Sequence, residues 1–127
     1  MTQLLLPTAL ALLIIFVVPF LVYGLAAVIG GVKAPEGISA AQFQFGVIIS
    51  KLGTAVAFVL IFYFARATFS AQWPLYALLW WVSFFTGEIG ETICGKYTWK
   101  EAVCGVISET IYLPLSAYVV HRLIGAA

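Results

Sequence analysis

Long apolar runs separated by short polar segments dominate this chain of 127 residues. The first run extends from Leu4 to Val32 without a charged residue. It is much longer than the apolar region of a signal peptide, about 7–15 residues, so we interpret it as a retained helix. Because about 20 apolar residues cross the hydrocarbon core of a bilayer, the length accommodates four such segments. The pattern predicts helices near residues 7–31, 39–67, 73–94 and 99–124.

Capping signals mark where these helices begin and end. Ser39 stands three residues before Gln42, and Thr98 stands three residues before Glu101. This is the spacing of a capping box, in which the first residue is the N-cap. Gly95 is expected at the C′ position that follows the third helix. Only a few residues then separate the third helix from the fourth, so the two are expected to be antiparallel neighbours.

The composition makes lipid the expected solvent for these helices. Hydrophobic residues make up 64% of the chain and charged residues 9%, whereas a soluble domain has about 25% charged residues. We therefore expect a single all-α domain over residues 1–127, a multi-pass integral membrane protein with four antiparallel transmembrane helices, in an inner or plasma membrane. The net charge is +1 and there is no basic cluster, so we expect the bilayer, and no nucleic acid, as a partner.

Two similar heptapeptides carry most of the acidic residues. Residues 87–93 read GEIGETI and residues 105–111 read GVISETI. Both lie in surroundings apolar enough for a bilayer, which places Glu88, Glu91 and Glu109 at membrane depth. Ionisable groups at that depth are rare and are generally functional. The three glutamates are therefore the candidate ion-binding or proton-binding residues.

One lysine is expected near these carboxyl groups. Depths are counted at 1.5 Å per residue from the membrane face at which the third helix ends. On this count, Glu88 lies about 9 Å deep, Glu109 about 15 Å and Lys51 about 18 Å, with Glu91 shallower. A lysine near the middle of a helix either extends toward the interface or pairs with a carboxylate. We favour the pair, which makes Lys51 the expected charge partner.

Small and polar residues near the carboxyl groups are expected to line a cavity, namely Ser50, Gly105, Ser108 and Tyr112. Three carboxyl groups and one ammonium group cannot all be charged cheaply in a low dielectric, so some carboxyls should be neutral or a cation should enter. Oxygen ligands suit a hard cation such as Mg²⁺, Ca²⁺ or Mn²⁺. The sequence otherwise indicates no cofactor, because one His and two Cys are too few for haem or structural zinc.

Two functions are compatible with this pattern. The first is a small transporter or channel subunit that moves protons or a cation past Glu88 and Glu109, with Glu91 at the mouth of the site. Four short helices enclose little volume, so this protein is expected to be a homo-oligomer. The second is an accessory or assembly subunit of a larger membrane complex, whose buried Glu and Lys groups only stabilise helix packing. We do not expect an enzyme, because there is no nucleophile–base pair, phosphate-binding loop or HExxH motif.

Overall fold

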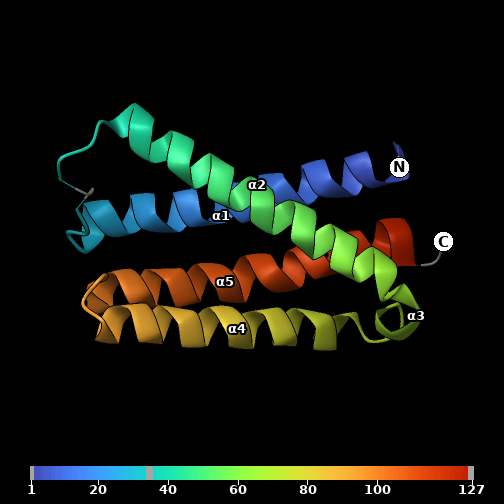
Figure 1. Cartoon of the computed structure of the whole chain (residues 1–127). Helices are drawn as coiled ribbons and strands as arrows, with labels where there is room; N and C mark the ends of the chain where they lie inside the picture. The colour runs from blue at the N-terminus through green and yellow to red at the C-terminus, as the bar shows by residue number, and fades with distance from the viewer. Residues whose placement is uncertain (1, 34–35, 126–127) are drawn as a thin grey trace.

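The computed structural model describes residues 2–33 and 36–125, which form helices and no strand. Successive long helices run in opposite directions, and the start of η1 and the end of η2 lie at the same end of the bundle (Figure 1). The largest differences from the predicted boundaries are at two helix ends: the fourth helix, predicted to end at residue 124, ends as an α-helix at Val120 and continues as η2, and the second, predicted to end at residue 67, ends at Phe64. The elements are η1 (Thr2–Leu4), α1 (Leu5–Ile29), α2 (Ala40–Phe64), α3 (Arg66–Phe69), α4 (Trp73–Ile93), α5 (Trp99–Val120) and η2 (His121–Gly125).

The turn between α4 and α5 is built from the residues that the sequence singled out. Gly95 has φ +83°, and the Lys96 N–H donates to the Glu91 carbonyl at 2.9 Å, as in a Schellman motif. The Thr98 hydroxyl accepts a hydrogen bond from the Glu101 N–H at 3.2 Å, so Thr98 is the N-cap of α5. These caps fix the register between α4 and α5, which lie side by side (Figure 1).

We expect Gly95→Ala to destabilise the protein by about 1–2 kcal/mol, because an L-residue is strained in the left-handed conformation. A Cβ at this position would meet no atom within 4 Å, so backbone strain is the only cost. A Cβ at Gly87 would likewise meet no atom within 4 Å. Because Gly87 is helical, Gly87→Ala should stabilise the protein by about 0.5–1 kcal/mol. Denaturant unfolding in mild detergent compares the two variants. Equal effects at both positions would contradict the assigned turn.

The segment between α2 and α4, predicted as a loop, contains a short helix. Ser39 caps α2 as expected, accepting from the Gln42 N–H at 3.1 Å. At the other end, the residues after Phe64 form the short helix α3 instead of extending α2 or remaining a loop. The Arg66 guanidinium donates to the Tyr63 carbonyl at 2.7 Å, and such a basic side chain at a C-terminus satisfies a carbonyl that has no partner within the helix.

The most apolar helices of this protein are the least buried, which is the reverse of the order expected in water. Mean hydropathy is 2.9 for Thr2–Ile29, 2.2 for Ala40–Phe64 and 1.5 for Trp99–Gly125, yet the buried shares of these segments are 11%, 22% and 50%. In water the most apolar helix would be buried most. An exposed helix that is apolar on every side indicates a membrane protein. All three helices are long and apolar enough to cross a membrane. The helix α4 is not among them, and it carries two glutamates and three tryptophans.

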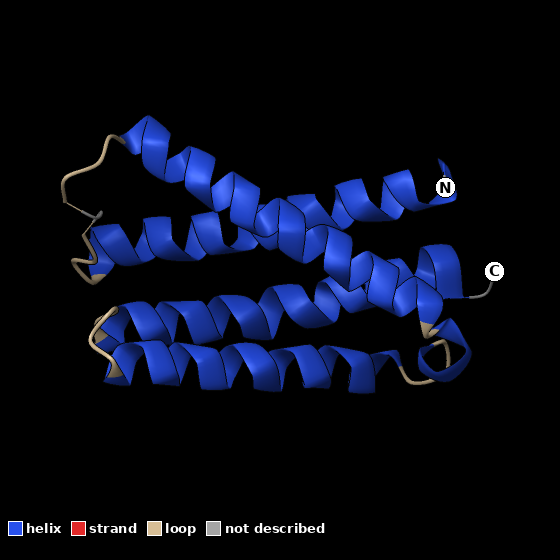
Figure 2. Ribbon diagram, in the orientation of Figure 1, coloured by secondary structure: helices blue, strands red, loops and turns tan. Residues whose placement is uncertain are grey.

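An aromatic core fills the half of the bundle nearest α3. Phe58 and Phe62 of α2 pack against Tyr76 of α4, with ring centroids 4.9 and 5.1 Å from the tyrosine ring. The Tyr76 hydroxyl donates to the Phe58 carbonyl, and fully buried Ile15 and Leu113 complete this core. Toward the other end, α2 diverges from its neighbours (Figure 2). Buried Thr92, Ser108 and Glu109 lie toward that end, whereas buried Ser116 lies on the side of the aromatic core.

Candidate functional site

The candidate site lies on the face of α5 that packs between α1 and α4. Half of α5 is buried even though it is the least apolar of the three candidate spans. Glu109 lies on this face and is only 5% exposed, and its Oε2 atom has no hydrogen-bond partner among the described residues. A buried carboxyl oxygen without a hydrogen-bond partner lowers the stability of the fold, so the presence of Glu109 at this position needs an explanation. The buried residues of this face are Ala102, Gly105, Glu109, Tyr112 and Ser116.

Glu88 reaches this face from α4. A Cβ at Gly105 would lie 2.4 Å from Glu88 Oε1 and 3.0 Å from Oε2, so the carboxyl group occupies the space that a side chain would need. Glu109 lies one turn further along the same buried face of α5, so the two carboxyl groups come close to each other there. A hydrogen bond between two carboxyl groups requires a proton on one of them. The two glutamates therefore form a pair suited to share a proton.

Lys51 of α2 faces the carboxyl pair without touching it. Its Nζ atom lies 5.3 Å from the centroid of the Tyr112 ring, which is the geometry of a cation–π contact. The ammonium interacts electrostatically with Glu109 and Glu88, but no carboxylate oxygen of the described residues lies within 4.0 Å of it. Lys51 is thus a nearby counter-charge held on an aromatic ring, and not a partner in a direct ion pair.

Glu91 lies outside the cluster that Glu88, Glu109, Lys51 and Tyr112 form. Its carboxylate is 3.2 Å from Lys96 Nζ at the end of α4, with the two side chains 41% and 66% exposed. An exposed ion pair of this kind contributes about 0–1 kcal/mol. The structure therefore places Glu91 in a surface contact beside the turn, while Glu88 turns inward.

Of the four residues predicted to line a cavity, two border the cluster and two do not. Gly105 seats the Glu88 carboxyl and Tyr112 lies beneath the lysine, so both border the cluster. Ser108 is buried, but its hydroxyl donates to the Cys104 carbonyl of its own helix at 2.8 Å. Ser50 is exposed on α2, where it lines a shallow groove of about 550 Å³.

Tyr23 of α1 also belongs to the cluster and was not predicted from the sequence. Its hydroxyl donates to the Glu101 carbonyl at 3.1 Å, and it interacts electrostatically with Glu88 and Glu109. It is the only titratable side chain between Leu5 and Ile29. That isolated polar group in an otherwise apolar helix is the signal that would have identified it.

Few metal-ligating side chains accompany the carboxyl pair in the part of the chain that the structure describes. Within residues 2–33 and 36–125 there is no group of three or more His, Cys, Asp or Glu side chains that could hold a metal. The nearby Lys51 ammonium adds a positive charge that opposes a metal cation.

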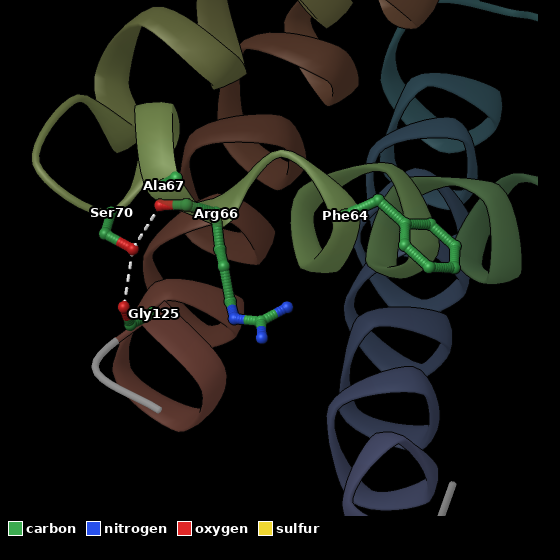
Figure 3. Close-up of a pocket in the computed structure, with 5 residues that line it drawn as sticks. All are labelled: Phe64, Arg66, Ala67, Ser70 and Gly125. Carbon is green, nitrogen blue, oxygen red and sulfur yellow. Dashed lines mark hydrogen bonds between the residues drawn. The ribbon is translucent and has the colours of Figure 1, made fainter.

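A second hollow, of about 450 Å³, lies at the opposite end of the bundle and is separate from the carboxyl pair. The Ser70 hydroxyl lies within hydrogen-bonding distance of the Arg66 and Gly125 carbonyl oxygens (Figure 3). This contact ties α3 to η2 and has a structural role. The hollow is lined by Phe64, Arg66, Ala67, Ser70 and Gly125.

The chain matches no known protein-family model, and no curated protein or solved structure is significantly similar to it. No activity can be carried over from a relative. A functional assignment therefore rests on the geometry of the carboxyl pair and its neighbours.

We expect Gly105→Ala to move the Glu88 carboxyl away from Glu109 while the bundle remains folded. The new methyl group would overlap Glu88 Oε1, but the carboxyl is the end of a flexible side chain and can turn away. Infrared spectroscopy should show a changed carboxyl band, with a melting temperature near that of the wild type. Gly90→Ala is the matched control, because a Cβ there meets nothing within 4 Å. An unchanged band in Gly105→Ala would contradict the placement of Glu88.

Proposed function

We propose that this chain is a proton-linked transport subunit with four transmembrane helices, in which Glu88 and Glu109 hold the proton that moves. The observation that carries the proposal is the position of the Glu88 carboxyl, which rests against Gly105 on the face of α5 that also carries buried Glu109 one turn further along. In this proposal α4 is the fourth span. Its 21 residues extend about 31 Å at 1.5 Å per residue, and the hydrocarbon core is about 30 Å thick.

The charges of the cluster support a single shared proton. With one proton between them, Glu88 and Glu109 carry one negative charge, which the Lys51 ammonium balances. Loss or gain of a proton leaves one net charge in the low-dielectric interior, which is unfavourable without compensation. Such a site keeps one proton at rest and exchanges it when the surroundings change. A proton-linked carrier requires this property of its intramembrane residues.

A homo-oligomer is part of this proposal. Gly46, Ser50 and Gly53 lie along an exposed face of α2, and small residues at such spacing allow another helix to approach closely. A Cβ at either glycine would meet no atom within 4 Å of the same chain. Mass measurement of the purified protein in mild detergent should therefore give a multiple of the 13.8 kDa chain.

One observation favours the accessory-subunit function. The groups of the cluster come from α1, α2, α4 and α5, so the same contacts that hold a proton also join helices. Polar contacts between membrane helices contribute about 0.6 kcal/mol on average, which is a modest gain for packing alone. Purification of a stoichiometric partner, without proton movement by the chain itself, would support this second function.

Reconstitution tests the proposed function. Purified protein is placed in lipid vesicles that contain a pH-sensitive dye, and a pH difference is imposed across the membrane. We expect the pH difference to collapse faster than in vesicles without protein. Equal rates in the two preparations would contradict proton transport by this chain.

A further inference from the structure

We propose that the carboxyl pair exchanges its proton with the membrane face at the α4–α5 turn, by way of the Tyr23 hydroxyl. This inference rests on the proposed function and adds a relay residue and a direction to it. Tyr23 is half-buried, and the transport proposal leaves its hydroxyl without a role.

The Tyr23 hydroxyl and the Glu88 carboxyl meet α5 at the same turn. Tyr23 donates to the carbonyl of Glu101 at 3.1 Å. In an α-helix that carbonyl also accepts from the N–H four residues later, which belongs to Gly105. Glu88 rests against Gly105, so the phenol and the carboxyl group lie at the same turn of α5.

The path continues to the surface at the α4–α5 turn. Tyr97 lies in that turn, is 46% exposed, and interacts electrostatically with both Glu88 and Tyr23. A hydroxyl group can accept one proton while it donates another, so tyrosines between a carboxyl and water suit proton transfer. The titratable groups that face the relay from α2, α4, the turn and α5 are Lys51, Glu88, Tyr97, Cys104, Glu109 and Tyr112.

In the conformation of this structure, apolar packing closes the opposite direction. Beyond Tyr112, the face of α5 continues with Leu113, Ala117 and Val120, all fully buried. They pack with the aromatic core of α2 and α4 and with Ile15 of α1. The hydroxyl of Ser116 is also fully buried and has no hydrogen-bond partner among the described residues. No described contact therefore connects the carboxyl pair to the α3 end.

The proton step changes only O–H bonds. The phenol oxygen of Tyr23 accepts the proton from the carboxyl pair as its own proton passes to water at the α4–α5 face. The reverse transfer returns a proton to the pair. Tyr23 is neutral before and after the step, and one proton leaves the cluster for each proton that reaches the water.

Hydrogen–deuterium exchange of the carboxyl proton tests the relay. The protein is mixed with D₂O in detergent, and the carboxyl band is followed by time-resolved infrared spectroscopy. We expect Tyr23→Phe to slow the exchange by about tenfold or more, within the range of rate effects of positioned proton-transfer groups. Tyr76→Phe is the matched control, because it also removes a tyrosine hydroxyl that donates to a helix carbonyl, but in the apolar half. It should exchange at the wild-type rate.

The outcomes separate the relay from the proposed function. Wild-type exchange in Tyr23→Phe, or equal slowing in Tyr76→Phe, overturns the relay while the carboxyl band and the vesicle flux still support transport. If the wild-type protein shows neither the carboxyl band nor the vesicle flux, the proposed function is overturned. If Tyr23→Phe does not fold, Tyr23→Gln replaces it, because the amide keeps a donor to the Glu101 carbonyl but cannot pass a proton as a hydroxyl does. It should exchange as slowly.

Discussion

Glu109→Gln is expected to reduce proton movement to the rate of protein-free vesicles and to leave the bundle folded. The amide has the shape of the carboxyl group, and its N–H can donate to Glu88 where the shared proton did. Ionised Glu88 then still balances Lys51, so the interior remains neutral. What is lost is the exchangeable proton. Vesicle flux and thermal melting in detergent measure the two effects on the same preparation.

The matched control for this change is Glu91→Gln. Glu91 forms an exposed ion pair with Lys96, so its replacement should preserve flux and change stability by about 1 kcal/mol or less. Full flux in Glu109→Gln would exclude Glu109 and leave Glu88 as the candidate. A marked loss of stability in Glu109→Gln would instead favour the packing role of an accessory subunit.

Lys51→Met is expected to destabilise the protein by about 2 kcal/mol, less than the loss of one partner from a fully buried charge pair, because the ammonium is half-buried and does not touch the carboxyl groups. Without the ammonium, the carboxyl pair keeps its negative charge with no compensation in the bundle. The triple change Lys51→Met, Glu88→Gln and Glu109→Gln removes every charge of the cluster. Most of the lost stability should therefore return in the triple variant. Denaturant unfolding in detergent compares these proteins.

Lys96→Met controls for the loss of a lysine as such. Lys96 is 66% exposed in its ion pair, so its replacement should cost about 1 kcal/mol or less. If Lys51→Met were as mild as Lys96→Met, the ammonium would not be the counter-charge of the carboxyl pair. If the triple variant were less stable than Lys51→Met, the carboxyls would stabilise the bundle by contacts that do not depend on charge.

The helices could be predicted from the sequence because the residues that mark them are close together in the chain. Apolar runs, the N-caps Ser39 and Thr98 and the C′ residue Gly95 depend on neighbours in the chain. The prediction that Glu88 and Glu109 lie near each other also used local information. The short turn makes α4 and α5 antiparallel, and each glutamate lies at a countable distance from it.

The remaining details depend on how helices rotate and tilt against one another. Glu91 is three residues from Glu88 and was expected in the same site, but it lies close enough to the helix end to reach Lys96 instead. The helix α1 is apolar on every side, so its sequence gives no buried face and could not direct Tyr23 toward α5. The tilt of α2 brings Lys51 onto the ring of Tyr112. No residue spacing within α2 specifies that contact.

The infrared spectrum of the purified protein at neutral pH tests the central claim, the shared proton, most directly. The account predicts the C=O band of a protonated carboxyl group that shifts in D₂O. This band should be absent from both Glu88→Gln and Glu109→Gln, because the remaining carboxylate is then ionised opposite Lys51. A wild-type protein without such a band, or a band that survives in both single variants, would contradict the account.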